Sequence, residues 1–288
     1  MDRTLGDFLG LALRMNHADS RRWAPSPLLY ASAVVHLGAA GAVLSRPGVW
    51  PWAVGAAALN HAALAAAGLW PRSQLLGPNW TRLPAHSDNA GTVAITIDDG
   101  PEPDVTARVL EQLQEHGACA TFFCVGDRVL RYRDLAQEIV RRGHAIENHS
   151  QRHRHDFSLL GPKRMSAEVS RAQDSIATVT GILPQFFRAP AGLRNPFLDP
   201  VLSHLKLRLV SWTRRGFDTV SVDANAVYRR VATALSAGDI LLLHDGNAAR
   251  SRGGGPVILE VLPRLLDALA SRGLRPVTLR SSLACATE

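Results

Sequence analysis

The chain contains almost no lysine and little cysteine, and its few cysteines limit the kinds of cross-linked or zinc-binding fold that it can adopt. Its 288 residues include three cysteines, Cys119, Cys124 and Cys285, which form neither a CxxC pair nor a zinc-finger spacing. We therefore expect no disulfide framework and no zinc finger, with the thiols buried and free. The basic residues are nearly all arginine, because Lys163 and Lys206 are the only lysines.

Aromatic residues make up 6% of the chain, and no basic run is interleaved with them. The formal net charge of +7 favours anionic lipid, acidic glycan or nucleic acid as a partner. Without aromatic residues among the basic ones, we expect no nucleic-acid surface. A solvated basic surface with no dedicated partner is the simpler interpretation. The sequence also lacks a glycine-rich phosphate loop at a strand–helix junction, which disfavours nucleotide chemistry.

The sequence divides into four parts. With 46% hydrophobic and 20% charged residues, the chain can build a core. Residues 1–27 form a polar leader that does not have the pattern of a cleavable signal peptide. Residues 28–70 are apolar, and residues 71–90 are rich in proline and glycine, which is typical of a linker. Residues 91–284 alternate between strand and helix patterns and form the main domain.

The apolar part consists of two uncharged stretches, Leu28 to Leu44 and Val49 to Trp70, joined by a short turn. Their lengths, about 17 and 22 residues, and the tryptophans at the ends of the second stretch predict a transmembrane hairpin. The alternative is a pair of alanine-rich helices packed in a soluble core. Asn60 and His61 lie in the middle of the second stretch, where polar groups are unfavourable unless they are paired.

The distribution of arginine indicates an orientation for this hairpin. The leader carries four arginines and the turn carries only Arg46, whereas Arg72 and Arg82 follow the second stretch. Positively charged flanks favour the cytoplasmic side. We therefore expect a bacterial-type inner membrane, with the leader and the main domain in the cytoplasm.

The main domain reads as repeated strand–helix units. Amphipathic helical patterns lie between most of the apolar strand patterns, which predicts a mostly parallel sheet or barrel. The expected strands are Thr92–Ile97, Ala118–Val125, His144–Glu147, Gln185–Arg188, Leu207–Trp212, Asp239–Leu243 and Leu274–Leu279. In a parallel barrel the chemistry lies at the carboxyl ends of the strands.

The first strand ends in two adjacent carboxylates, Asp98 and Asp99, followed by Gly100 and Pro101. Two negative charges a few ångströms apart are unfavourable unless a cation lies between them. The pair therefore suggests a metal site. The same four residues are also good surface-turn chemistry, so this stretch alone leaves both interpretations open.

Histidines follow the third strand. His149 and His153 are four residues apart, and one helical turn would place both on the same face. Two imidazoles with a distant carboxylate make a facial metal site with open positions, although an HxxxH pair alone is a weak signal. We expect the neighbouring His144 and His155 to lie around this site or on the surface.

Ionisable groups follow the later strands as well. Arg188 ends the fourth strand, Asp218 follows the fifth, and His244 ends the sixth, where it could equally be a satisfied core histidine. Five of the seven expected strand ends carry such groups, which would be unusual for a fold without a site at that edge.

In this combination the region from about Thr92 to about Leu279 resembles the polysaccharide deacetylases with the NodB homology domain, carbohydrate esterase family 4. Five motifs occur in the family's order. They are Thr-Ile-Asp-Asp-Gly-Pro at 96–101, His-Ser-Gln-Arg-His at 149–153, Arg-Ala-Pro-Ala-Gly at 188–192, Trp212 to Asp218, and Leu-Leu-His-Asp at 242–245. The resemblance implies a distorted (β/α) barrel of about seven parallel strands, preceded here by the apolar two-helix hairpin. It also implies a divalent metal, most often Zn²⁺, with Co²⁺ or Ni²⁺ as alternatives.

The resemblance assigns roles to matching residues. Asp99, His149 and His153 are the implied metal ligands. Asp98 is the implied general base, which takes a proton from the nucleophilic water. His244 is the implied general acid, which protonates the departing amine.

The resemblance also implies supporting groups. Arg188 orients Asp98, and Asp218 keeps His244 protonated. The backbone N–H of Ala191 is the implied second donor to the oxyanion, a contribution of about 3 kcal/mol in comparable sites.

Two departures from the family pattern affect the substrate groove. Residues 215–219 lack the first aspartate and the tryptophan found in many relatives, so a simple chitin preference is not expected. Ala191 stands where an aromatic residue is frequent, which would widen the cleft. Residues 247–256, with three consecutive glycines, are predicted to form a mobile lid; a tolerated surface insertion is the alternative.

The sequence thus predicts a metal-dependent hydrolase that removes an N-acetyl or other N-acyl group from an amino sugar. The substrate would be a polysaccharide, an oligosaccharide or a peptidoglycan-type glycan, and residues 28–70 would hold the enzyme at a membrane. One alternative is a deformylase or deacetylase of a lipid-linked sugar. Another is a catalytically inactive glycan-binding protein.

Overall fold

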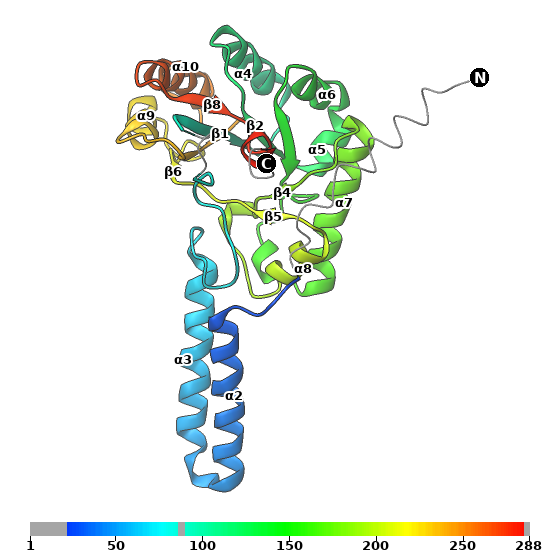
Figure 1. The fold of residues 1–288 in the computed structure, drawn as a ribbon, viewed down its shortest axis with the longest axis vertical. Coiled ribbons are helices and arrows are strands. Elements are labelled where there is room, and N and C mark those ends of the chain that lie inside the picture. The colour runs from blue at the N-terminus through cyan, green and yellow to red at the C-terminus, as the bar shows by residue number, and fades with distance from the viewer. Residues whose placement is uncertain (1–21, 86–89, 285–288) are drawn as a thin grey trace, which may run out of the picture.

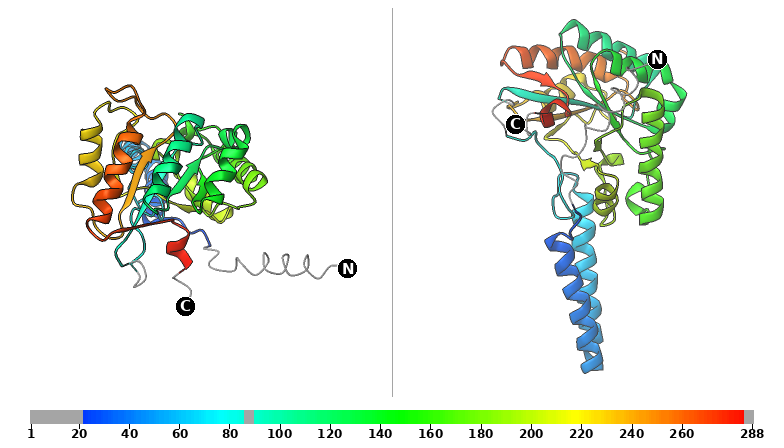
Figure 2. Two further views of the ribbon diagram at one scale, coloured as in Figure 1. Left: turned by 90° about the horizontal axis from the view of Figure 1, so that it is seen from above. Right: turned by 45° about the vertical axis from the view of Figure 1, so that its right-hand side comes forward.

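The computed structural model describes residues 22–85 and 90–284. A two-helix hairpin projects from an α/β domain, and the two parts give the protein an elongated shape (Figures 1 and 2). Most of the expected leader, residues 1–21, lies outside the described residues, as does Cys285.

The hairpin consists of α2 (Pro27–Ser45) and α3 (Trp50–Leu69), joined by the short 3₁₀ helix η1 (Pro47–Val49). At 1.5 Å per residue, helices of 19 and 20 residues are about 30 Å long, which equals the hydrocarbon thickness of a bilayer. Only 6% of the apolar window of α2 and 11% of that of η1–α3 is buried. Neither helix is therefore buried in a core formed by the described residues.

Polar side chains within the hairpin pair with one another. Asn60 Nδ2 donates to Ser32 Oγ across the two helices at 2.8 Å. The Nε2 atoms of His36 and His61 lie 3.3 Å apart, and His36 Nδ1 contacts the Ser32 carbonyl at 2.7 Å. The mid-hairpin polar residues that would be costly alone thus satisfy each other between the helices.

The sheet of the domain has the strand order β5-β4-β3-β2-β1-β7-β6, with β8 pairing the first half of β1, and every named pair is parallel. This curled sheet confirms the predicted distorted (β/α) barrel. The strands are β1 (Thr92–Asp98), β2 (Thr121–Cys124), β3 (Ala145–Asn148), β4 (Phe186–Phe187), β5 (Arg208–Leu209), β6 (Arg214–Arg215), β7 (Ile240–His244) and β8 (Arg275–Val277). The short β6 is the one strand that the apolar pattern did not predict.

Most of the helices cover the outer face of this sheet (Figure 1), whereas Leu283 of α11 packs with the residues of its inner face. The outer helices α4, α9 and α10 present their apolar sides to the strands, and β1 is buried along its whole length between β2 and β7. The helices are α4 (Pro103–Glu115), α5 (Gly126–Arg131), α6 (Arg133–Arg141), α7 (Pro162–Thr180), α8 (Leu198–His204), α9 (Ala224–Ala232), α10 (Val257–Ala270) and α11 (Ser281–Ala284), with 3₁₀ turns η3 (Phe157–Leu159) and η4 (Pro190–Gly192). This arrangement places all carboxyl ends of the strands at one edge.

Part of the segment expected to be a linker packs against the domain. Trp80 forms a parallel bridge with Val210, and its N–H donates to the Leu209 carbonyl at 2.9 Å. Leu83 is buried, and its N–H donates to the Gly238 carbonyl just before β7. The segment therefore spans the gap between the β5 side and the β7 side of the curled sheet.

The base of the hairpin docks on the carboxyl edge of the sheet. The Arg194 N–H donates to the Gly68 carbonyl at the end of α3, and a Cβ at Gly68 would lie 2.2 Å from the Arg194 carbonyl oxygen. Ser211 Oγ donates to the Pro71 carbonyl at 2.6 Å. The loop after β4 and the end of β5 thus hold the hairpin at the edge where the candidate catalytic groups lie.

Candidate active site

Three side chains converge at the carboxyl edge. Asp99 Oδ1 lies 3.2 Å from His149 Nε2 and 3.1 Å from His153 Nε2. One ligand atom from each residue lies within 4.8 Å of the other two. Asp99 follows β1 and His149 follows β3, so two parallel strands separated by β2 carry the first two groups. The structure therefore brings together the three residues predicted to bind a metal.

The segment that carries the two histidines is a loop. The sequence predicted a helical turn from His149 to His153, and this prediction is wrong, since no helix covers these residues. Ser150 and His153 have positive φ angles of 65° and 49°. Ser150 Oγ accepts from the His153 N–H at 3.1 Å, and the Ser150 N–H donates to Asn148 Oδ1. These local bonds stabilise a bent backbone that turns both imidazoles toward Asp99.

Neighbouring groups fix the orientation of two of these side chains. His149 Nδ1 lies 2.8 Å from the Arg188 carbonyl, to which it donates, so Nε2 is the ring nitrogen that faces Asp99. Asn247 Nδ2 donates to Asp99 Oδ2 at 3.1 Å. The remaining oxygen, Asp99 Oδ1, is buried and has no hydrogen bond among the described residues.

This donor set fits a divalent cation. Burial by itself would raise the pKa of Asp99, but the imidazoles of His149 and His153 hold it well below the usual range of a carboxyl. Asp99 is therefore ionised. Its Oδ1, which has no hydrogen bond among the described residues, faces the Nε2 atoms of His149 and His153. One carboxylate and two imidazoles suit Zn²⁺, Co²⁺ or Ni²⁺ and leave coordination positions open for other ligands.

Asp98 is held in place by a buried arginine. Arg188 Nη1 donates to Asp98 Oδ1 at 2.6 Å and to Thr96 Oγ1 at 2.8 Å. The other guanidinium nitrogens, Nε and Nη2, donate to the carbonyls of Val210 and Ser211, so all three nitrogens take part in hydrogen bonds. Asp98 Oδ2 takes no part in the ion pair with Arg188 and lies 3.8 Å from His149 Nε2.

His244 ends β7 in register with Asp98 of β1, so the two residues occupy adjacent positions on neighbouring strands. Its Nδ1 donates to Asp218 Oδ1 at 2.9 Å, and its backbone N–H donates to Asp218 Oδ2 at 2.7 Å. Burial lowers the pKa of His244, but the carboxylates of Asp218 first, and then of Asp98 and Asp99, offset this and raise the pKa above its ordinary value. The arrangement favours an imidazolium whose Nε2–H is available to a substrate.

Ala191 lies on the short η4 turn after β4 and has a left-handed backbone, with φ 55° and ψ 5°. Its N–H has no hydrogen-bond partner within residues 22–85 and 90–284, and its side chain is exposed. Close by in the fourth motif, the Arg215 guanidinium lies 5.3 Å from the Trp212 ring centroid and 5.0 Å from that of Phe217. This stack of Arg215 with two aromatic rings occupies the part of the chain where the family pattern departs.

The remaining expectations concern surrounding residues. The expectation that His144 lies around the site or on the surface is wrong, because it is buried in the core: its Nδ1 accepts from the Ala120 N–H and its ring packs on Phe122. His155 is exposed, with its ring 6.2 Å from that of His153. Within the expected lid, residues 247–256, the Ser251 N–H donates to the Gly255 carbonyl at 2.7 Å. The motion of this segment stays a prediction.

Sequence reasoning missed two residues that support the site. Thr96 lies two residues before Asp98 and therefore on the same face of β1, so strand periodicity could have identified it. Asn247 carried no comparable signal, because its contact with Asp99 spans 148 positions of the chain.

Comparison with known proteins agrees with this geometry. The family model described as "Polysaccharide deacetylase" matches residues 85–210. The chitooligosaccharide deacetylase of Azorhizobium caulinodans is 33% identical over 194 residues, which are 65% of this chain and 92% of the relative. A peptidoglycan-N-acetylglucosamine deacetylase of Bacillus cereus is 30% identical over 198 residues, 68% of this chain and 90% of the relative.

A solved structure leads to the same family. The family 4 carbohydrate esterase from Streptomyces lividans, solved in complex with acetate, superposes with a TM-score of 0.59 at 32% identity. The alignment covers 65% of this chain and 91% of that one. With these relatives and the convergent side chains at the sheet edge, the chain belongs to the polysaccharide deacetylase family, carbohydrate esterase family 4.

Proposed function

We propose that this protein is a metal-dependent hydrolase that removes the N-acetyl group from an amino sugar in a glycan. The observation that carries the proposal is the convergence of Asp99, His149 and His153 next to Asp98, which is the register partner of His244. The set contains a cation site, a carboxylate and an imidazolium, which together are what amide hydrolysis requires.

Asp99, His149 and His153 would hold the cation, with Zn²⁺ as the first choice and Co²⁺ or Ni²⁺ as alternatives. When bound, such a cation supplies Lewis acidity to the amide carbonyl and to the attacking water. Because Asp99 carries the charge that binds it, the adjacent Asp98 remains free for proton transfer.

Asp98 and His244 carry out the two proton transfers. Asp98 Oδ2 takes the proton of the attacking water, while Arg188 holds Oδ1 and keeps the carboxylate oriented. His244 donates its Nε2 proton to the departing amine, which leaves poorly without it, and Asp218 maintains the protonated form. The free N–H of Ala191 stabilises negative charge on the carbonyl oxygen during attack.

The substrate class follows from the relatives. Those two deacetylases are named for chitooligosaccharides and for the N-acetylglucosamine of peptidoglycan. We therefore propose an N-acetylglucosamine-type sugar, with the other N-acyl groups as variants of the same chemistry.

The proposal includes a membrane location. Two exposed apolar helices of bilayer length, with Trp50, Trp52 and Trp70 exposed near the ends of α3, support insertion of residues 28–70. The arginine distribution supports a cytoplasmic catalytic domain at a bacterial-type inner membrane.

A single experiment tests the hydrolase assignment. The full chain, purified in detergent and loaded with Zn²⁺, is incubated with acetylated and formylated glycans, and free amine is measured by mass spectrometry. We expect amine release by the parent chain and a 10²- to 10⁴-fold lower rate for Asp98→Asn at unchanged zinc content. Stoichiometric zinc without any amine release would instead support the inactive glycan-binding alternative.

A further inference from the structure

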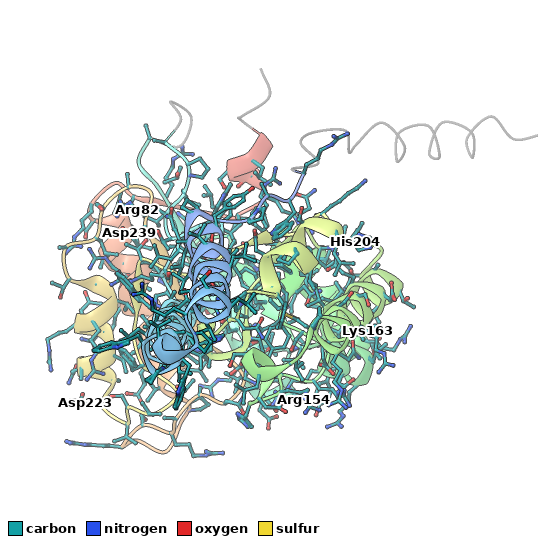
Figure 3. The ribbon with its side chains drawn as sticks, turned by 90° about the horizontal axis from the view of Figure 1, so that it is seen from below. Arg82, Arg154, Lys163, His204, Asp223 and Asp239 are labelled. Carbon is teal, nitrogen blue, oxygen red and sulfur yellow. The ribbon has the colours of Figure 1, made fainter. Side chains whose placement is uncertain are left out.

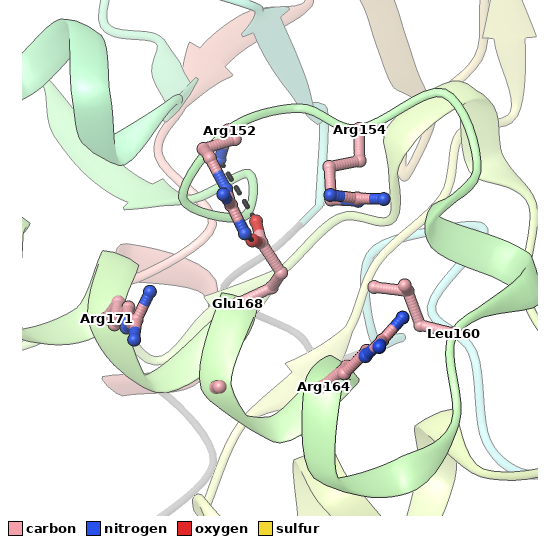
Figure 4. A pocket seen from close by; sticks show the side chains of 7 residues that line it. Arg152, Arg154, Leu160, Arg164, Glu168 and Arg171 are labelled. Atoms are coloured by element: carbon pink, nitrogen blue, oxygen red, sulfur yellow. Dashed lines mark hydrogen bonds and ion pairs between the residues drawn. The ribbon is translucent and has the colours of Figure 1, made fainter.

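A basic pocket lies beside the metal-binding loop (Figure 4). It has a volume of about 340 Å³. Four arginines line it together with Glu168 and Leu160: Arg152, Arg154, Arg164 and Arg171. When Glu168 and Asp156, the partner of Arg154, are set against the four arginines, the formal charge around the pocket is +2.

Two of the four guanidinium groups already have carboxylate partners. Arg152 Nε donates to Glu168 Oε1 at 2.7 Å, and Arg154 Nε donates to Asp156 Oδ1 at 2.8 Å. Arg164 and Arg171 form no ion pair within the described residues, and both are exposed. Like charges around one cavity repel each other. An anion that contacts several guanidinium groups would therefore lower the electrostatic energy of the pocket.

The chemistry of the pocket favours phosphate. The planar arginine fork matches phosphate oxygens in two-point contacts, and several forks around one cavity can share one phosphate or diphosphate. Glu168 is 3% exposed and is paired with Arg152, so it does not place a free carboxylate in the opening. A neutral sugar would leave the charge surplus uncompensated.

Two residues of the pocket lining adjoin a candidate metal ligand in the chain. Arg152 and Arg154 directly flank His153, so their Cα atoms lie about 3.8 Å from that of a candidate metal ligand. A phosphate in the pocket and a sugar at the cation could therefore belong to one molecule.

The pocket also lies on the side of the domain from which the hairpin emerges. The first half of α7, through Met165 and Val169, packs in one core cluster with Leu198 of α8. The loop before α8 docks on the end of α3 through Arg194. In the view from the hairpin end, Arg154 and Lys163 lie near the periphery of the domain on one side (Figure 3).

An exposed apolar side chain adjoins the pocket. Leu159, on η3, is 83% exposed and is the chain neighbour of Leu160 in the pocket lining. A leucine in this position costs little when it contacts lipid but is unfavourable in water. The surroundings of the pocket therefore combine positive charge with an exposed apolar side chain.

We propose that this pocket binds the phosphate group of a lipid-linked sugar, so that the N-acylated sugar processed at the neighbouring metal site is presented by a membrane lipid. The proposal rests on the deacylase function above and specifies its substrate: an amino sugar joined to a membrane lipid through phosphate or diphosphate.

The test compares two substrates that differ in the phosphate. Full-length protein in nanodiscs of neutral phosphatidylcholine receives an N-acetylglucosaminyl lipid diphosphate or a neutral chitooligosaccharide, and kcat and KM are measured for both. In Arg164→Gln/Arg171→Gln we expect KM for the lipid diphosphate to rise ten- to hundredfold more than KM for the neutral substrate. Arg108→Gln, an exposed arginine of α4, is the matched control and should change neither value.

Two further measurements separate the outcomes. Titration with a water-soluble short-chain prenyl diphosphate should show weaker binding by the double variant even if no substrate is deacylated, which distinguishes failure of the pocket from failure of the hydrolase assignment. Equal changes for both substrates, or no change for either, would overturn the proposal. The proposal would also be overturned if phosphatidylglycerol vesicles that carry no sugar competed as strongly as the prenyl diphosphate, because the pocket would then bind lipid head groups in general.

Discussion

Arg188 Nη1 lies 2.6 Å from Asp98 Oδ1 in an ion pair whose two side chains are 1% and 4% exposed. The guanidinium also lies 4.1 Å from the centroid of the Phe123 ring. Both charges are thus removed from water, and each depends on the other for compensation. The candidate base is fixed by a residue 90 positions away, so its orientation depends on the packing of β1 against the loop after β4.

Replacing Arg188 should therefore harm both folding and catalysis. In Arg188→Met the Asp98 carboxylate is buried without a partner, and we expect a loss of about 3–5 kcal/mol in the free energy of unfolding. Urea unfolding followed by circular dichroism measures it. In the Asp98→Asn background the same change should cost clearly less, since no charge is left to compensate. Additive losses in this double-mutant cycle would contradict the pairing.

Asp218→Asn should shift the pH dependence of the reaction. Because the Asp218 carboxylate raises the pKa of His244, its loss lowers that pKa. The protonated, acid-competent form then disappears at lower pH, so the alkaline limb of kcat/KM should move toward acid. Asparagine keeps an oxygen for the backbone N–H of His244. A pH profile with an unmoved alkaline limb would show that His244 is not the proton donor.

Asn247→Ala should weaken metal binding without unfolding the protein. Its amide donates to Asp99 Oδ2 and orients the carboxylate, and loss of such supporting bonds typically lowers metal affinity 10- to 100-fold. Competition with a zinc-binding dye measures the dissociation constant. Asn225→Ala serves as the control, because this exposed asparagine at the start of α9 accepts from Arg264 Nη1 and makes no contact with Asp99. Identical zinc affinity in Asn247→Ala and the parent chain would exclude a role for this amide.

His144 should make the domain sensitive to mild acid. Burial, with a smaller contribution from Arg142, lowers its pKa from 6.5 to about 4. Between these values the unfolded chain binds a proton that the folded chain does not, so stability is full above pH 6.5 and falls as the pH drops toward 4. We expect this residue to account for roughly 2–3 kcal/mol of that fall.

Thermal unfolding between pH 7 and 4, with a chelator present throughout, measures this effect. His144→Gln retains an acceptor for the Ala120 N–H but does not titrate, so its stability should fall less over the same range. The prediction fails if the parent chain and the variant lose the same stability between pH 6.5 and 4.

Cysteine labelling tests the orientation of the hairpin. Gly48 lies in the turn between the helices, and a Cβ there meets no atom within 4 Å, so Gly48→Cys should be tolerated. In intact cells, a membrane-impermeant maleimide should label Gly48→Cys, whereas Arg108→Cys on α4 should react only after lysis. The reverse pattern would invert the orientation, and protection of both sites before lysis would argue against a crossing.

The sequence alone was sufficient for seven of the eight strands of the domain and for the edge that carries the chemistry. Alternating apolar runs and amphipathic segments determine where strands and helices form, because burial of one face is a local property of the pattern. The five motifs, through their resemblance to one family, identified Asp99, His149 and His153 as a set and paired Arg188 with Asp98.

Tertiary structure decided what depends on distant contacts. The loop form of residues 149–153, the packing of Trp80 on Val210, the amide of Asn247 on Asp99 and the docking of Gly68 on Arg194 all involve positive backbone angles or partners far apart in the chain. Local periodicity carries no information about such partners, because their proximity is set by how strands and helices pack and not by spacing along the sequence. The same packing gathered four arginines from a loop and a helix into one pocket beside His153.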